Sequence, residues 1–246
     1  GAPMTTSFSL HSPIKGSNVG LGFSFLNDKV GPTNTNWINA DFSYSLKFKK
    51  SQSRLAFGIK AGLHLLNGDL ASLTKQDPSD VSLNTRYENE VKPNWGGGIY
   101  YHAPQWFVGA TVPRILETKL DPFDAVYLDQ RHYYLMAGGY FNASRMLKIR
   151  PSAMLKLTEE APFALDLSLA FIFYDKLWLG ANYRLEESAG FILQYQISDQ
   201  FKIGYGLDIA TSKLVKTNAG SHEILLSYNL RFKQKSLLSP RMTYCF

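Results

Sequence analysis

Apolar side chains recur at every second position along most of this chain. In residues 163–173 (FALDLSLAFIF), Phe and Leu occupy all the odd positions, while Ala, Asp and Ser occupy most of the even ones. Successive side chains of a β-strand point to opposite faces of its sheet, so this period predicts strands with one apolar and one polar face. The same alternation is found in residues 38–48, 54–65, 177–186, 190–198, 201–209 and 223–232.

The length of these segments decides between two kinds of β-protein. A soluble β-sandwich also alternates, but its strands usually have about five or six residues, whereas a tilted strand that crosses a membrane needs roughly ten. The repeating segments here have about that longer length. Their apolar face is almost free of charge, and their polar face carries charges at mid-strand, for example Asp41 and Lys60. We therefore predict an all-β fold, an antiparallel transmembrane β-barrel with its apolar face toward lipid.

The connections predict a topology. Tight joins, such as IKGSN (14–18) and KSQS (50–53), alternate with longer joins at 27–36, 66–93, 114–130, 158–162 and 211–220. Outer-membrane barrels have short periplasmic turns and longer outer loops, and an even number of strands. The chain should then start on the outer side, and its last strand should end in the periplasm.

We count about thirteen strands, and therefore expect one additional N-terminal strand, fourteen in the complete protein. The expected domains are a barrel over 1–232 and a periplasmic tail over 233–246. The predicted strands are 3–11, 18–26, 37–49, 54–66, 94–103, 105–113, 131–142, 146–157, 163–173, 176–186, 189–197, 200–210 and 221–232.

Composition narrows the function classes. The net charge of +6 is scattered, with no basic run longer than Lys47–Lys50, so nucleic acid is not an expected partner. The single cysteine, Cys245, excludes an internal disulfide framework. Residues 93–113 carry no charge, but the triple glycine at 96–98 and Pro104 favour two strands and a turn over a membrane helix.

No catalytic or cofactor motif is found. The five histidines are dispersed and lack metal-ligand spacing, so local structural roles are expected for them. The glycines at 20, 22 and 96–98 lack the helix and lysine of a phosphate loop, which favours strand glycines. The join 66–93 carries acidic and amide oxygens without EF-hand spacing, so an ordinary polar loop is the preferred interpretation over a calcium site. We predict no catalytic residue, no cofactor and no metal site.

The polar face supplies the candidate site, a network of charged side chains inside the barrel. The preferred interpretation is that opposite charges on neighbouring strands pair with one another across the ladder. The alternative is a site for a cargo segment or a solute. The candidate residues are Asp41, Lys60, Lys148, Arg150, Asp166, Arg184, Lys202, Asp208, Glu223 and Arg231.

A set of segments spread along the whole chain carries a family resemblance. The segments are SLHSPI (9–14), VGLGFSFLNDKVGPTN (19–34), FGIKAGLHLLNGDLASL (57–73), FVGATVPRILETK (107–119), APFALDLSLAFIFYDKLWLGANYR (161–184), QISDQFKIGYGLD (196–208), GSHEILLSYNL (220–230) and SPR (239–241). Together they resemble the PorP/SprF family.

The resemblance implies a type IX secretion system protein of the Bacteroidota outer membrane, associated with protein secretion, surface attachment of cargo or gliding motility. It implies as partners the C-terminal domain of a secreted cargo protein, periplasmic components of the secretion machinery, or both, in addition to outer-membrane lipid. The PorP-like and SprF-like roles stay open at this point.

The sequence thus predicts a non-enzymatic outer-membrane barrel that binds secreted cargo at the cell surface or the periplasmic machinery. An outer-membrane channel or solute transporter is the first alternative, and stable conductance in planar bilayers would favour it. An enzyme acting on membrane lipid is the second alternative, but the sequence offers no convincing catalytic pair for it.

Overall fold

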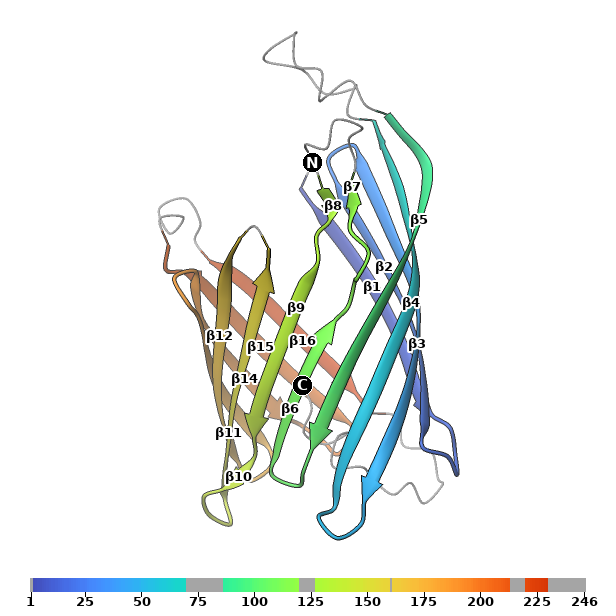
Figure 1. Ribbon diagram of the computed structural model, residues 1–246. Coiled ribbons are helices and arrows are strands. Elements are labelled where there is room, and N and C mark those ends of the chain that lie inside the picture. Colours follow the sequence, from blue (N-terminus) through green and yellow to red (C-terminus); the bar gives the residue numbers. More distant parts are fainter. Residues whose placement is uncertain (1, 70–85, 120–126, 160, 213–219, 230–246) are drawn as a thin grey trace. The chain divides into compact units, whose positions relative to one another are not determined.

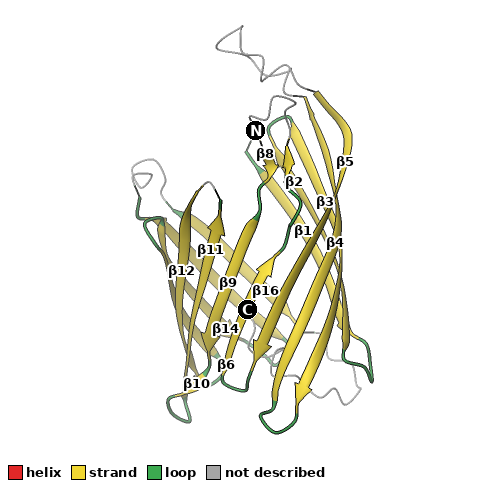
Figure 2. Ribbon diagram, in the orientation of Figure 1, coloured by secondary structure: helices red, strands yellow, loops and turns green. Residues whose placement is uncertain are grey.

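The computed structural model describes residues 2–69, 86–119, 127–159, 161–212 and 220–229. These residues form strands and connecting loops, with no helix among them (Figure 2). Accordingly, this described part of the chain holds no helix long and apolar enough to span a membrane. The strands are β1 (Met4–Pro13), β2 (Val19–Val30), β3 (Thr33–Phe48), β4 (Ser53–Asp69), β5 (Arg86–His102), β6 (Trp106–Val112), β7 (Thr118–Lys119), β8 (Tyr127–Asp129), β9 (His132–Gly139), β10 (Phe141–Asn142), β11 (Leu147–Thr158), β12 (Ala161–Phe173), β13 (Leu177–Arg184), β14 (Ser188–Gln196), β15 (Phe201–Ala210) and β16 (Ser221–Tyr228).

Fourteen of these strands form one antiparallel sheet, in which neighbours in space are neighbours in the chain. Its path runs β1-β2-β3-β4-β5-β6-β9-β11-β12-β13-β14-β15-β16, and β10 pairs with β11 off that path. The thirteen strands of the path correspond one to one with the thirteen predicted strands, which confirms the predicted all-β, antiparallel sheet. Strands β7 and β8 pair only with each other and were not predicted.

The chain divides into two compact units, which are described separately. The first comprises residues 1–141 and 151–167, and the second comprises residues 142–150 and 168–246. Strands β1 to β9 belong to the first unit, and β13 to β16 belong to the second. Strands β11 and β12 contribute residues to both.

In the first unit, the apolar side chains are the exposed ones. Along β3, Phe42 and Tyr44 are each 42% exposed, while the polar residues between and beside them, Asp41, Ser43 and Ser45, are less exposed. Ile59, opposite Phe42 on β4, is 64% exposed. A water-soluble sheet would bury this face against a second layer. The exposed apolar face therefore indicates a sheet that faces hydrocarbon.

In the second unit, too, apolar side chains are exposed and the polar side chains between them are less exposed. On β14, Phe191, Leu193 and Tyr195 are exposed, whereas the glutamines that alternate with them are not. Across the described residues, only two large apolar side chains are buried, Leu66 and Ile172, and both lie on the polar face by their position in the alternation. Neither unit therefore has the buried apolar core of a soluble domain.

The tight joins occur where the sequence predicts them. The turn between β12 and β13 places Tyr174 at φ 52° and Asp175 at φ 57°, which is the geometry of a type I′ hairpin. Three of the predicted longer joins are shorter than predicted, however. Strand β2 continues to Val30 and β3 starts at Thr33, and only two residues separate the end of β11 at Thr158 from the start of β12 at position 161. In the predicted join 66–93, residues 66–69 belong to β4 and residues 86–93 belong to β5. Polar residues in 27–36 indicate a loop by composition, but the ladder between β2 and β3 continues through them.

On β2 and β3, the apolar band of the first unit has a sharp limit on the side of the longer joins. On β3 it runs from Ile38 to Phe48, about the length that a tilted membrane strand requires. The next two residues on that face are Asn36 and Asn34. The Asn27 amide donates to the Asn36 Oδ1 at 2.9 Å and the Asn34 Oδ1 at 2.6 Å. We call Asn27, Asn34 and Asn36 the asparagine row, and it marks the outer limit of the apolar band.

Replacing Ile59 by Arg tests the direction of the apolar face. Because Ile59 lies opposite Phe42, near the middle of the band, I59R should destabilise the protein folded in lipid vesicles by about 2–4 kcal/mol. The control S45R places the same charge on the polar face and should change stability by about 0.5 kcal/mol. Urea unfolding in vesicles measures both, and equal effects would contradict the assignment of the faces.

Candidate functional site

The polar face of the first unit holds two ion pairs between neighbouring strands. The Lys60 ammonium lies 3.5 Å from the Asp41 carboxylate, and the two residues are directly opposite in the β3–β4 register. Lys156 on β11 lies 2.7 Å from Asp166 on β12. All four side chains are about one-fifth to two-fifths exposed, so each pair contributes modestly, on the order of 0.2–1 kcal/mol. Asp41 and Lys60 are thus two candidate residues that lie together.

In the second unit, two candidate cations contact acidic residues of the joins. Lys148 binds Asp175 in the type I′ turn between β12 and β13. Arg184 binds Glu187 at 2.8 Å, in the join that follows β13. Both contacts fix a turn at the end of a strand. Sequence reasoning identified these cations but missed the two turn carboxylates that bind them.

The remaining candidate residues have different surroundings. The Lys202 ammonium lies 5.2 Å from the centre of the Trp178 ring. One oxygen of Asp208 accepts a hydrogen bond from the Ser188 hydroxyl at 3.3 Å. Arg150 and Glu223 form no ion pair within the described residues, and Arg231 lies outside them. The candidate set therefore consists of local contacts in each unit, and a cargo or solute site built from it stays a prediction.

The histidines have separate local partners. His64 stacks on Trp37, with ring centres 4.6 Å apart. His222 shares a 2.6 Å hydrogen bond with the Tyr205 hydroxyl, and a ring nitrogen of His132 lies 2.9 Å from the Gln130 carbonyl oxygen. In the described part of the chain, no three His, Cys, Asp or Glu residues gather in a way that could hold a metal ion.

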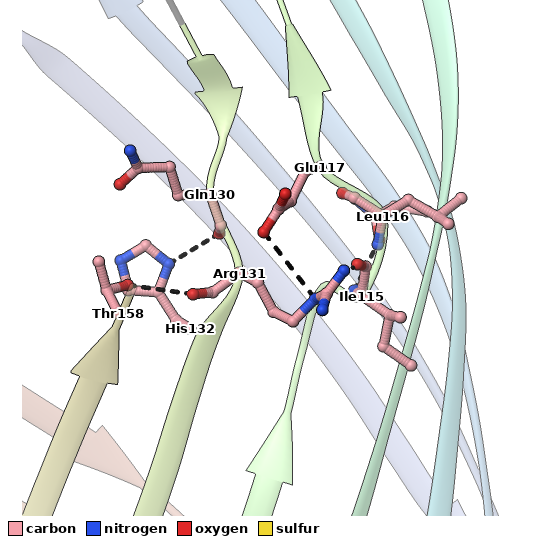
Figure 3. A network of polar contacts seen from close by, with 8 residues as sticks. Ile115, Leu116, Glu117, Gln130, Arg131, His132 and Thr158 are labelled. Carbon is pink, nitrogen blue, oxygen red and sulfur yellow. Dashed lines mark hydrogen bonds and ion pairs between the residues drawn. The ribbon is translucent and has the colours of Figure 1, made fainter. Parts of the chain in front are cut away.

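A second polar site, which the sequence did not indicate, lies where β6 leaves the sheet (Figure 3). Strand β5 has 17 residues, whereas β6 has only 7, and their pairing covers only Gly97 to His102 of β5. The pairing of β6 with β9 ends at Thr111 and Tyr134, and beyond it residues 113–117 diverge toward β5. We call this region the Arg131 junction, formed by Asn94, residues 113–117 and Arg131.

Asn94 binds the diverging segment to β5. Its amide nitrogen donates to the Leu116 carbonyl at 2.8 Å. Its amide oxygen accepts from the backbone N–H groups of Trp95, Ile115 and Leu116, at 2.8, 3.1 and 3.2 Å. Asn94 is only 8% exposed. One side chain therefore replaces several ladder hydrogen bonds that β6 would have made.

Gly96 allows the close approach of this segment. A Cβ atom at this position would lie 2.3 Å from the Pro113 carbonyl oxygen and 2.7 Å from its carbonyl carbon. Backbone atoms cannot move aside as a flexible side chain can. Sequence reasoning placed the glycines at 96–98 in a strand, which is confirmed, but gave no sign that one of them accommodates another segment.

Arg131 connects the diverging segment to the start of β9. Its Nε donates to the Ile115 carbonyl at 3.0 Å and lies 4.0 Å from a Glu117 carboxylate oxygen. The Arg131 carbonyl accepts from the Thr158 hydroxyl at 3.1 Å. A side-chain hydrogen bond with Tyr133 raises the pKa of the Arg131 guanidinium, a group that is charged at its ordinary pKa as well. In Figure 3, the side chain lies between the two diverging chain segments, on the side where Ile115 and Glu117 are found.

Asn94 should contribute strongly to stability, because its loss leaves two backbone N–H groups and one carbonyl without partners. We expect N94A to lower the free energy of unfolding by about 2–4 kcal/mol in urea titrations. The control N94D retains the acceptor oxygens and loses one donor, so it should have a smaller effect of about 1 kcal/mol. A change below 0.5 kcal/mol for N94A would rule out the role assigned to Asn94.

One comparison with known proteins identifies the family. Residues 1–228 match the family model described as type IX secretion system membrane protein PorP/SprF. Among curated proteins, none matches the chain. The match covers the whole main sheet, whose all-β, antiparallel architecture agrees with a family of membrane β-barrels. The chain therefore belongs to the PorP/SprF family of type IX secretion system membrane proteins.

Proposed function

We propose that this protein is a non-enzymatic outer-membrane barrel that binds the C-terminal domain of a secreted cargo protein at the cell surface. The observation that carries the proposal is the length of β3, β4 and β5. These strands have 16, 17 and 17 residues, whereas roughly 9–11 suffice to cross the hydrocarbon. The three strands lie next to one another in the sheet (Figure 1), and they extend past the apolar band, which ends at Ile38 on β3.

The extension lies on the side of the longer joins. At the tight-turn end, the apolar band of β3 reaches its last residue, Phe48. At the other end, the asparagine row limits the band, and β4 and β5 continue past it to Asp69 and Arg86. Roughly six residues of each strand, about 20 Å, project past the hydrocarbon. Because outer-membrane barrels place long joins outside the cell, we assign this wall to the cell surface.

Two other roles have less support. Binding to periplasmic machinery would use the tight-turn end, where joins such as Tyr174–Asp175 offer little contact area. The tail 233–246, which is expected to be periplasmic, lies outside the described residues. A channel remains the alternative from a different class, since charged side chains such as Asp41 and Lys60 lie on the polar face. Stable openings in planar bilayers would favour that alternative.

A labelling experiment tests the surface assignment. In a C245S background, we place a single cysteine at Val30, beside the β2–β3 turn, or at Lys49, in a tight turn. A membrane-impermeant maleimide should label V30C in intact cells, and should label K49C only after the cells are opened. The reverse result would contradict the orientation.

The same variants test cargo binding. Affinity purification from the native outer membrane should recover a large secreted protein of the type IX system with the unmodified chain. Coupling a 5-kDa poly(ethylene glycol) maleimide to V30C should abolish this recovery, because the polymer covers the projecting wall, and coupling at K49C should leave it unchanged. If the unmodified chain recovers only periplasmic components, or no secretion component at all, the proposed function is wrong.

A further inference from the structure

Strand β5 has an edge without a paired strand in the projecting wall. Within the described residues, the pairing of β5 with β6 ends at Gly97 of β5, although β5 itself continues outward to Arg86. The short β7–β8 hairpin does not pair with β5. An unpaired strand edge exposes backbone donors and acceptors that another strand can use.

The direction of each backbone group follows from contacts already described. In an antiparallel sheet, the N–H and C=O of one residue point to the same side, and successive residues alternate. The Trp95 carbonyl accepts from Ile115 at 2.8 Å, on the β6 side. Trp95, Pro93 and Val91 therefore direct their backbone groups away from β4, and the register from Gly98 to Glu90 is uninterrupted.

The chain itself provides partners for the inner part of this edge, near Trp95, and provides none among the described residues for the part further outward. At Trp95, Asn94 binds the N–H and Ile115 binds the carbonyl. At position 93, proline has no N–H to expose. At Val91, both backbone groups point to the open side. Val91 lies opposite Leu65, which lies opposite Asn36 of the asparagine row, so the open part starts where the apolar band ends.

Apolar side chains surround the open edge. Val91 is 52% exposed and Trp95 is 57% exposed, on the same face of β5. Ile115 and Leu116, held next to β5 by Asn94, are 41% and 42% exposed. Val91 lies in the same register row as Asn36 and Asn27, where the apolar band of β2 and β3 ends. Exposed apolar side chains in such a place indicate contact with another protein.

We propose that an extended segment of the secreted cargo domain adds to β5 as a strand, starting at Val91 and running outward toward Arg86, with its inner end next to the exposed side chains of Ile115 and Leu116. A polypeptide fits this edge because its backbone matches the N–H and C=O of Val91, and its alternate side chains cover the apolar patch. A lipid chain would satisfy neither backbone group. Pro93 and Asn94 prevent pairing below this level, so the added strand stays outside the hydrocarbon. The inference depends on the proposed function, since it specifies where the cargo domain binds.

The substitution V91P tests the pairing directly. The Val91 N–H points away from β4, so proline removes the donor offered to the cargo and leaves the β4–β5 ladder intact. The native Pro93 shows that this side of β5 accepts proline. The control V91A keeps the N–H and loses only apolar contact. Heat-modifiable migration in SDS should show that both variants fold.

The binding probe is the purified C-terminal domain of the secreted protein that the unmodified chain recovers. We expect V91P to weaken its binding about tenfold or more, and V91A to weaken it about threefold or less. Hydrogen–deuterium exchange supplies a second measurement: in the unmodified chain, cargo should slow exchange at Val91 and leave Trp95 unchanged.

The outcomes separate the two proposals. If V91P binds the domain as tightly as the unmodified chain and Val91 exchange is unaffected, the strand-addition site is wrong, while the cargo-binding function stands. Crosslinking from position 91 to other parts of this same chain would also overturn the site, because the edge would already be occupied. If the unmodified chain binds no secreted domain, both proposals fail.

Discussion

In hydrocarbon there is no water to bind a backbone N–H or C=O group, so each of them must find a partner in the protein. This constraint accounts for the continuous antiparallel ladder among the described residues. It also explains the Arg131 junction. Where β6 leaves the sheet, the groups of Trp95 would be orphaned close to the membrane limit, and Asn94 and Ile115 bind them. Beyond that limit, water is available, and within the described residues the outer part of β5 pairs with no strand on that side.

The same constraint made most of the fold predictable. The side chains of a membrane strand point alternately to lipid and to the interior, so apolar and polar residues alternate along it. Segments such as 163–173 can therefore be recognised as strands from the sequence. Tight turns were found for a related reason, since they interrupt the alternation over a few residues. The alternation ceases to be informative where lipid ends. In residues 27–36 both faces are polar, and composition alone could not distinguish a continuing ladder from a loop.

The candidate site was predicted less well than the fold. Charges on the polar face are visible in the sequence, and the general expectation that opposite charges pair across neighbouring strands holds for Asp41 and Lys60, although the sequence did not single out this pair. The acidic partners of Lys148 and Arg184 lie in turns, and the sequence does not reveal which turn residue comes close to each cation. Asn94 and Gly96 looked like ordinary strand residues, because their role comes from a segment about twenty positions further along the chain.

The asparagine row has a consequence for how deeply the first unit sits in its bilayer. Its three amides bind one another on the face that, a few residues lower, carries Ile38 and Phe42. If the protein sank by one pair of residues, roughly 7 Å along the strand, these amides would enter the acyl chains. If it rose by the same amount, large apolar side chains would leave lipid for water. The asparagine row thus fixes the depth of these strands in the bilayer. In a membrane of different thickness, the lipid around the protein would have to thicken or thin to match the apolar band.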